Sequence, residues 1–290
     1  MYFKRQITVI IPALNEASSI AKVINGLFEL RACHHCSQVS PPAEGCAPFD
    51  YQCAENPGDR DHHKYDCDCS DASPEQIVDQ VIVCDNGSTD DTAAIAASCG
   101  AIVTCETEQG YGAACLAALA VAVEKDIIVF VDGDHSVVAS ELPDLITPLI
   151  KGDADLVIGS RTLGNCERGA LSIPQRFGNQ LASFLIRRLW SCAVTDLGPF
   201  RATTQATLEE LKMSDKRFGW TVEMQIRALQ LDKRTVEVPV TTRRRIGQSK
   251  ISGTMRGVIG AAHGILGTIF KLHLARPAGN KPEPLISRDY

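Results

Sequence analysis

One segment of the chain, residues 127–135, reads Ile-Ile-Val-Phe-Val-Asp-Gly-Asp-His and joins an unbroken apolar run to two carboxylates. An apolar, partly β-branched run of this length is typical of a strand that is buried on both faces of a sheet. The two acidic residues then lie at the carboxyl end of that strand. Ligands of parallel sheets bind at this edge, so the segment predicts both a buried strand and a polar site beside it.

Four more apolar runs precede or follow this segment, and stretches with helical periodicity separate them. The expected strands are residues 7–11, 81–84, 102–104 and 156–158, in addition to 127–131. The expected helices are residues 20–28, 90–98, 113–123 and 141–150. Regular alternation of strands and helices predicts an α/β protein with a mostly parallel sheet that is covered by helices on both faces.

The composition excludes several classes of protein. The chain has 290 residues, of which 44% are hydrophobic, and a formal net charge of -6. It therefore lacks the overall positive charge of a general nucleic-acid binder. The first apolar run ends at Pro12, too early for a secretory leader, and no window approaches the roughly 20 apolar residues of a spanning helix. We expect a cytoplasmic protein whose cysteines are thiols or metal ligands.

Acidic residues follow three of the expected strands. Glu16, Asp85 and Asp132 each stand shortly after an apolar run, and Asp134 lies two residues beyond Asp132. Because the carboxyl ends of parallel strands share one edge of a sheet, these carboxylates are expected to converge on one crevice. Paired carboxylates bind hard cations such as Mg²⁺ or Mn²⁺ together with phosphate groups, so Asp132 and Asp134 are the candidate metal ligands.

Six short motifs occur in the same order as in one enzyme family. They are IIPALNE at 10–16, DNGSTD at 85–90, DGD at 132–134, IGSR at 158–161, TDLGPFR at 195–201 and RIGQSK at 245–250. Through these motifs the chain resembles the family 2 glycosyltransferases, which have the Rossmann-like GT-A fold, over about residues 5–32 and 74–255. Within that family it is most similar to the polyprenyl-phosphate sugar transferases, such as dolichyl-phosphate mannose synthase.

The resemblance implies an activity and assigns roles to residues. The activity is metal-dependent, inverting transfer of a hexose from a nucleotide sugar, of the UDP-glucose or GDP-mannose type, to a polyprenyl phosphate for cell-envelope glycans. The donor ligands would be Pro12, Ala13, Asn15, Glu16, Asp85, Asp132 and Arg161. Asp132 and Asp134 would hold the metal, and Asp134 is also counted as catalytic. The related synthases often have Gln where this chain has Ser136, so His135 would either replace that ligand or point away.

Basic residues supply candidates for phosphate binding. Three arginines, Arg243 to Arg245, precede Lys250, and guanidinium groups suit phosphate oxygens, although a run of charges also occurs on solvated surfaces. The resemblance favours Arg245, Ser249 and Lys250 as a clamp for the donor diphosphate or the acceptor phosphate. Arg161 and Arg201 are further phosphate candidates, with surface ion pairs as the alternative.

The acceptor determines whether a general base is needed. A phosphate acceptor is already anionic and needs none, whereas a hydroxyl group must lose a proton. The candidate bases are Asp196 and Glu223, with a turn-forming aspartate and a solvent-facing helical glutamate as the alternatives. Two other functions remain open: transfer to a soluble or glycan hydroxyl, and nucleotide-sugar binding without catalysis.

An insertion rich in Cys and His, residues 33–73, interrupts the alternation of strands and helices. Cys33, Cys36, Cys67 and Cys69 form one candidate structural zinc site, although the second pair has C-x-C spacing. The alternatives are a disordered insertion without metal and, in third place, disulfide bonds. Residues 1–240 are otherwise expected to form the GT-A catalytic domain.

The C-terminal part is expected to contain a basic loop and a helix with a glycine stripe, residues 241–275, and then a disordered tail, residues 276–290. Small residues along one face allow a helix to pack closely. This helix is expected to pack on the catalytic domain or on a second subunit of a homo-oligomer. The alternative is contact with a membrane, which would place the protein at its cytoplasmic face.

Overall fold

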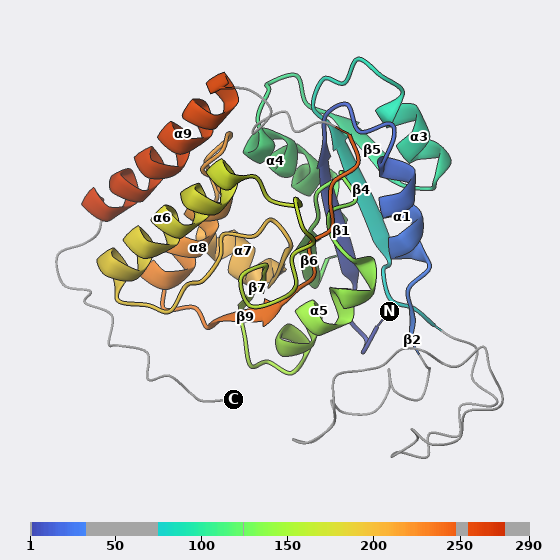
Figure 1. Ribbon diagram of the computed structural model, residues 1–290. Coiled ribbons are helices and arrows are strands. Elements are labelled where there is room, and N and C mark those ends of the chain that lie inside the picture. Colours follow the sequence, from blue (N-terminus) through green and yellow to red (C-terminus); the bar gives the residue numbers. More distant parts are fainter. Residues whose placement is uncertain (1, 33–74, 124, 248–254, 276–290) are drawn as a thin grey trace.

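The computed structural model describes residues 2–32, 75–123, 125–247 and 255–275 of the chain, with only the backbone for 255–259 (Figure 1). Three sets of predictions concern residues that lie outside the described ranges. They are the candidate zinc ligands Cys33, Cys36, Cys67 and Cys69, the phosphate candidates Ser249 and Lys250, and the tail from residue 276.

The described residues contain one large, mostly parallel sheet. Its seven strands lie in the order β5 (Ile102–Cys105), β4 (Gln80–Asp85), β1 (Ile7–Ala13), β6 (Ile127–Phe130), β8 (Arg201–Thr204), β7 (Leu156–Ser160) and β9 (Thr235–Pro239). Only β8 is antiparallel to its neighbours in this sheet. The expected α/β class and all five expected strands are confirmed, whereas β8 and β9 were not predicted. A small separate sheet pairs β2 (Arg31–Ala32) with β3 (Glu75–Gln76).

Helices cover both faces of the sheet, as the sequence predicts (Figure 1). The first face carries α1 (Ile20–Phe28), α3 (Thr92–Ser98) and α5 (Leu142–Ile150), with the short helix η1 (Ala139–Glu141) before α5. The second face carries α4 (Tyr111–Val121), α7 (Gln205–Leu211) and α8 (Trp220–Gln230). Strand β1 connects the two cores, because its side chains alternate: Val9 and Ile11 pack on the first face, and Ile10 packs on the second.

Two further helices, α6 (Ile173–Trp190) and α9 (Met255–Leu274), form an outer layer over α8. Ile269 and Leu272 of α9 are buried against α6 and α8. Gly260 and Gly264 of the glycine stripe lie against Phe218, so the helix backbone approaches the segment before α8 closely. For the described residues, the expected packing of this helix on the preceding part of the chain is therefore confirmed. None of the described helices has both the length and the hydropathy that crossing a membrane requires.

The start of α4 depends on an unusually close backbone contact. The backbone N–H of Ala113 donates to the carbonyl of Lys216 at 2.9 Å, and that of Gly112 donates to the carbonyl of Arg217. A Cβ atom at Gly112 would overlap the carbonyl oxygen of Asp215. Glycine at this position thus lets the 215–217 loop supply acceptors to the first N–H groups of the helix.

We predict that Gly112→Ala lowers the free energy of unfolding by about 2–4 kcal/mol, because the loop must move and its hydrogen bonds weaken. Gly267→Ala in α9 is the matched control, since a Cβ there meets nothing within 4 Å. It should leave stability unchanged or raise it by up to about 1 kcal/mol. Urea unfolding of both variants measures the difference, and equal effects would contradict this account of the α4 contact.

Candidate active site

Four acidic side chains lie near the carboxyl edge of β4, β1 and β6. Ala13 pairs with Asp85 across β1 and β4, and Ile10 pairs with Phe130 across β1 and β6. Asp132 and Asp134 therefore follow β6 beside the segment that carries Glu16. Strand pairing thus brings together residues from three distant parts of the sequence, as predicted.

A single guanidinium connects two of these carboxylates. The Nη2 of Arg245 lies 3.0 Å from Oε1 of Glu16, and its Nη1 lies 3.4 Å from Oδ2 of Asp134. The backbone holds Arg245 there, because the N–H of Ile246 donates to the carbonyl of Asp134 at 3.0 Å. The N–H of Arg243 likewise donates to the carbonyl of Ser136 at 2.9 Å. The basic loop, residues 243–246, is thus hydrogen-bonded along the acidic loop, residues 132–136.

Asp132 is the most strongly perturbed carboxylate of this group. Burial and the neighbouring charge of Asp134 raise the pKa of Asp132 to about 7, although Tyr111, Arg245 and Arg161 oppose the rise. Its Oδ1 atom is buried without a hydrogen-bond partner among the described residues. A buried acceptor without a donor is costly unless a ligand or ion completes it.

The donor set of this pair suits a hard divalent cation. Mg²⁺ is commonly bound by one or two carboxylates together with substrate phosphates. Asp132 offers the unpartnered Oδ1, and Asp134 holds its own loop through a hydrogen bond from the N–H of Ser136 to Oδ1, at 2.9 Å. Within the described ranges, no group of three or more His, Cys, Asp or Glu side chains is arranged as a complete metal cage.

The loops that follow β1 and β4 are hydrogen-bonded to each other. Asn15, which has a positive φ of 53°, accepts a 2.7 Å hydrogen bond from the N–H of Thr89 through its side chain. Its own N–H donates to Oγ of Ser88 at 2.9 Å. Asp85 accepts from the N–H of Ser88 through Oδ2, and its Oδ1 is buried without a partner in the described part of the chain. This arrangement leaves Asp85 an acceptor for a ligand at the end of β1, where Pro12 also lies.

Asp196 is fully buried and bound to Arg161. Nε and Nη2 of Arg161 reach the two oxygens of Asp196 at 2.8 and 2.6 Å. The N–H groups of Arg161 and Leu197 donate to the same carboxylate. Burial opposes ionisation of Asp196, but the Arg161 guanidinium and these N–H groups hold its pKa below the usual value. A carboxylate with this many donors is poorly suited to act as a general base. The geometry instead favours a role in which Asp196 orients the guanidinium of Arg161.

Glu223 is also saturated with donors. It accepts hydrogen bonds from the N–H and Oγ of Ser214, from the N–H of Asp215 and from Nε of Arg227. Burial raises its pKa, but these hydrogen bonds outweigh burial and lower it. Glu223 therefore neither faces solvent nor presents a free carboxylate, and it holds the loop that contacts α4.

Arg201, a phosphate candidate in the sequence, is buried inside the fold, which excludes the alternative of a surface ion pair. Its guanidinium donates to the carbonyls of Gly198 and Thr221, and burial lowers its pKa to about 10. Because Arg201 is fully buried, a phosphate could contact it only if the surrounding packing opened. The structure thus separates Arg201 from Arg161, although the sequence suggested the same role for both.

An apolar groove of about 500 Å³ opens beside Asp132. Its polar end contains Asp132, Arg161 and Tyr111. Its walls come mainly from α6 and α9, through Pro174, Phe177, Leu181, Ala261, Ala262, Ile265 and Leu266. The sequence analysis did not identify this groove, because no motif marks the residues of α6.

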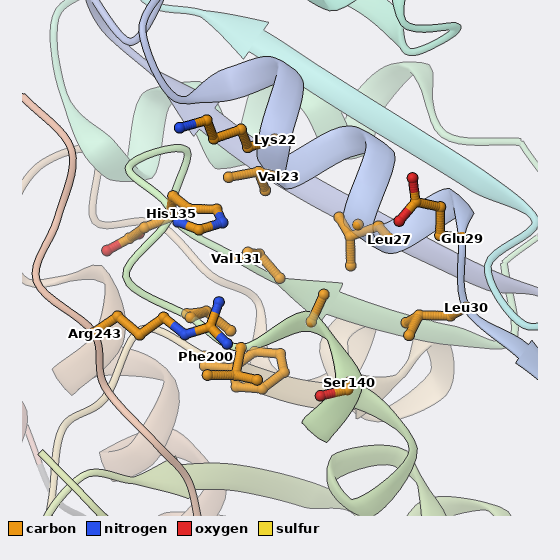
Figure 2. Close-up of a pocket in the computed structure, with 15 residues that line it drawn as sticks. Lys22, Val23, Leu27, Glu29, Leu30, Val131, His135, Ser140, Phe200 and Arg243 are labelled. Carbon is orange, nitrogen blue, oxygen red and sulfur yellow. The ribbon is translucent and has the colours of Figure 1, made fainter. Parts of the chain in front are cut away.

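A second pocket, of about 300 Å³, also reaches Asp132, from the side of α1. Figure 2 shows Lys22, His135 and Arg243 along one side of it and Glu29 at the opposite end. Burial lowers the pKa of His135, and the charges of Arg243 and Lys22 lower it further. His135 lines this basic pocket together with Arg243, which belongs to the predicted basic stretch, and with Lys22, which the sequence did not single out.

Arg245 and a divalent cation would place positive charge at the same carboxylates. We predict that Arg245→Gln binds Mn²⁺ about three- to tenfold more tightly than the unaltered protein when no other ligand is present, because Asp134 loses its resident cation. Electron paramagnetic resonance titration at pH 8 measures free Mn²⁺ while keeping Asp132 ionised. Arg244→Gln, on an exposed side chain, is the control and should bind as the unaltered protein does. Weaker binding by Arg245→Gln would contradict the assignment.

The buried pair of Asp196 and Arg161 makes stability depend on pH. Because folding lowers the pKa of Asp196, its contribution is present above the unfolded pKa and is lost as the pH falls through the folded pKa. We predict that Asp196→Asn costs about 3 kcal/mol at pH 7 and that this difference shrinks below about pH 4. Chemical unfolding across this range measures it, and a difference that is independent of pH would contradict the charge pairing.

Comparisons with known proteins give the family. A sequence profile described as glycosyl transferase family 2 matches residues 72–210. A Mycobacterium tuberculosis (strain H37Rv) protein described as an uncharacterized glycosyltransferase is 38% identical over 183 residues, which are 62% of this chain and 81% of the relative. The undecaprenyl-phosphate mannosyltransferase of Micrococcus luteus is 31% identical over 205 residues, 66% of this chain and 81% of that protein.

The fold has counterparts among solved structures. Glucosyl-3-phosphoglycerate synthase of Mycobacterium tuberculosis, in complex with Mn²⁺, UDP and phosphoglyceric acid, superposes with a TM-score of 0.62. The match covers 93% of this chain and 79% of the synthase, at 22% sequence identity, and so shows a shared GT-A fold. Together with the relatives, it leads to one conclusion: the chain belongs to glycosyltransferase family 2 and is a glycosyltransferase.

Proposed function

We propose that this glycosyltransferase moves a hexose from a nucleotide sugar to a polyprenyl phosphate, with Mg²⁺ or Mn²⁺ at Asp132 and Asp134. The observation that carries the proposal is the groove, which has a charged end at Asp132 and Arg161 and long apolar walls. A prenyl chain needs an apolar channel, and its phosphate needs a cationic end. The relatives named undecaprenyl-phosphate mannosyltransferase and dolichyl-phosphate hexose transferase support this acceptor class.

The donor would bind over the ends of β1 and β4. Asp85, through its unpartnered Oδ1, would accept a hydrogen bond from the nucleoside, next to Pro12 and Ala13. Asn15 and Glu16 would hold the loop that shapes this pocket. The solved neighbour was obtained in complex with UDP, which supports a nucleotide donor, and its Mn²⁺ and Mg²⁺ support a divalent cation.

The diphosphate would then lie between the carboxylate pair and the basic loop. A bound cation would neutralise the charge that builds up on the leaving diphosphate. Arg245, once separated from Asp134, would donate to diphosphate oxygens through its planar guanidinium. Ser249 and Lys250, which follow Arg245 in the sequence, remain predicted ligands of a phosphate.

Transfer to a phosphate would require no base from this chain. An acceptor phosphate oxygen would attack C1 of the hexose while the bond from C1 to the donor diphosphate breaks. The nucleoside diphosphate leaves with the bonding electrons, and C1 inverts. This chemistry agrees with Asp196 and Glu223, whose carboxylates are saturated by donors. Arg161, which Asp196 orients at the end of the groove, would attract the acceptor phosphate.

A second candidate acceptor is a small soluble phosphate ester. The basic pocket of Lys22, His135 and Arg243 favours it, because that pocket also reaches Asp132 and is large enough for a three-carbon acid. The named substrate of the solved neighbour, phosphoglyceric acid, belongs to this class. Such an acceptor would have a hydroxyl as its nucleophile and would need a base.

The test is a transfer assay with Mn²⁺ across UDP- and GDP-hexoses, using either a short polyprenyl phosphate in detergent or 3-phosphoglycerate. We expect transfer from one donor to the lipid phosphate, and product that partitions into organic solvent. Transfer to phosphoglycerate alone would move the assignment to the basic pocket. Absence of transfer to either acceptor, with donor hydrolysis intact, would contradict both candidates.

A substitution in the groove tests whether the prenyl chain of the acceptor binds there. Ala262 lines the groove, so we predict that Ala262→Phe raises the KM for the polyprenyl phosphate about tenfold or more and leaves the donor Kd unchanged. Ala94→Phe, on the exposed side of α3, is the matched control and should change neither constant. An unchanged KM for Ala262→Phe would exclude this groove as the site of the prenyl chain.

A further inference from the structure

The outer face of α6 is unusually apolar for an exposed surface. Ile173, Phe177, Leu181 and Phe184 are spaced by four, four and three residues, which places them on one face of the helix. They are 83%, 65%, 37% and 55% exposed. The opposite face of α6 is already used, because Ala182, Ile186 and Trp190 pack in the core with α8 and α9. We call these four exposed residues the α6 stripe.

The two helices of the outer layer carry side-chain charges of one sign. The chain as a whole carries a formal charge of -6, yet the sequences of α6 and α9 contain no Asp or Glu. Arg176 and Arg188 of α6 are exposed beside the stripe, and Lys271 lies near the end of α9. Surfaces that combine bulky apolar groups with basic side chains suit the interface of an anionic bilayer.

The α6 stripe is continuous with the groove that reaches the active site. Phe177 and Leu181 belong to both, and the other end of the groove lies at Asp132 and Arg161. Figure 1 shows α6 and α9 side by side on the outside of the molecule. A surface that the stripe contacts would therefore face the mouth of the groove.

We propose that the α6 stripe and its flanking arginines dock the protein on a membrane that contains anionic lipids. Pairing of two copies through this face fits less well, because a symmetric interface would bring the same basic side chains together. The proposal rests on the proposed function in one respect: a lipid acceptor could then enter the groove directly from the bilayer. Docking itself requires neither donor nor acceptor, so it can be tested alone.

The experiment is vesicle binding by the full chain, without donor or acceptor, using phosphatidylcholine vesicles with and without phosphatidylglycerol. We expect binding to the anionic vesicles that weakens with salt. Ile173→Ser with Phe184→Ser should weaken it about tenfold or more, and Arg176→Gln with Arg188→Gln should weaken it about tenfold at low salt. Ile102→Ser, on an exposed residue of the far edge strand β5, is the matched control and should bind normally.

Two further measurements separate the outcomes. Neither Ile173 nor Phe184 lines the groove, so their double variant should keep transfer to a detergent-solubilised acceptor, which also shows that it is folded. If transfer to lipid phosphate occurs but the unaltered protein ignores anionic vesicles, docking is wrong and the proposed function stands. If sedimentation shows a dimer that the double variant loses, the face is a subunit interface and the proposal is overturned. Binding that appears only after residues 277–290 are removed would overturn it as well, because that segment would then cover the stripe.

Discussion

The candidate active site depends on one constraint: several carboxylates are gathered where they are largely shielded from water. Glu16 and Asp134 share the guanidinium of Arg245, and Asp132 is close enough for that cation to oppose the rise of its pKa. Carboxylates gathered in this way repel one another unless a cation accompanies them. Arg245, which lies 229 residues from Glu16 in the sequence, supplies that cation and explains why the basic loop is hydrogen-bonded along the acidic one.

The same centre lies between two different environments. Asp132 borders the apolar groove under α6 and α9 on one side and the basic pocket beside α1 on the other. The proposed transfer from a water-soluble donor to a lipid phosphate would use both kinds of surface near one reacting carbon. The glycines of α9 contribute here, since Gly260 and Gly264 allow that helix to approach Phe218, which also lines the groove. The packing of α9 in the outer layer thus also determines the shape of the groove.

The sequence predicted five of the parallel strands because they are nearly continuous apolar runs. It missed the parallel edge strand β9, in which polar residues alternate with Val236 and Val238. It also missed β8, in which Arg201 and Thr203 are buried but satisfied by backbone carbonyls, so the strand has no apolar pattern. The carboxylates at the strand ends were predicted for a related reason: chain order fixes which residues follow a buried strand. Side-chain hydrogen-bond partners were not predictable from the residue pattern, whether distant in sequence, as Arg161 is from Asp196, or near, as Ser214 and Asp215 are to Glu223. These partners decide that Asp196 orients Arg161 and that Glu223 holds a loop.

The most direct measurement is a crystal structure with Mn²⁺, a nucleoside diphosphate and a short polyprenyl phosphate. The account predicts an anomalous peak at Asp132 and Asp134, with Arg245 moved from Asp134 to the diphosphate. It also predicts prenyl density between α6 and α9, with the lipid phosphate near Arg161. Manganese bound elsewhere, or a prenyl chain outside the groove, would contradict the claim that one charged centre serves both substrates.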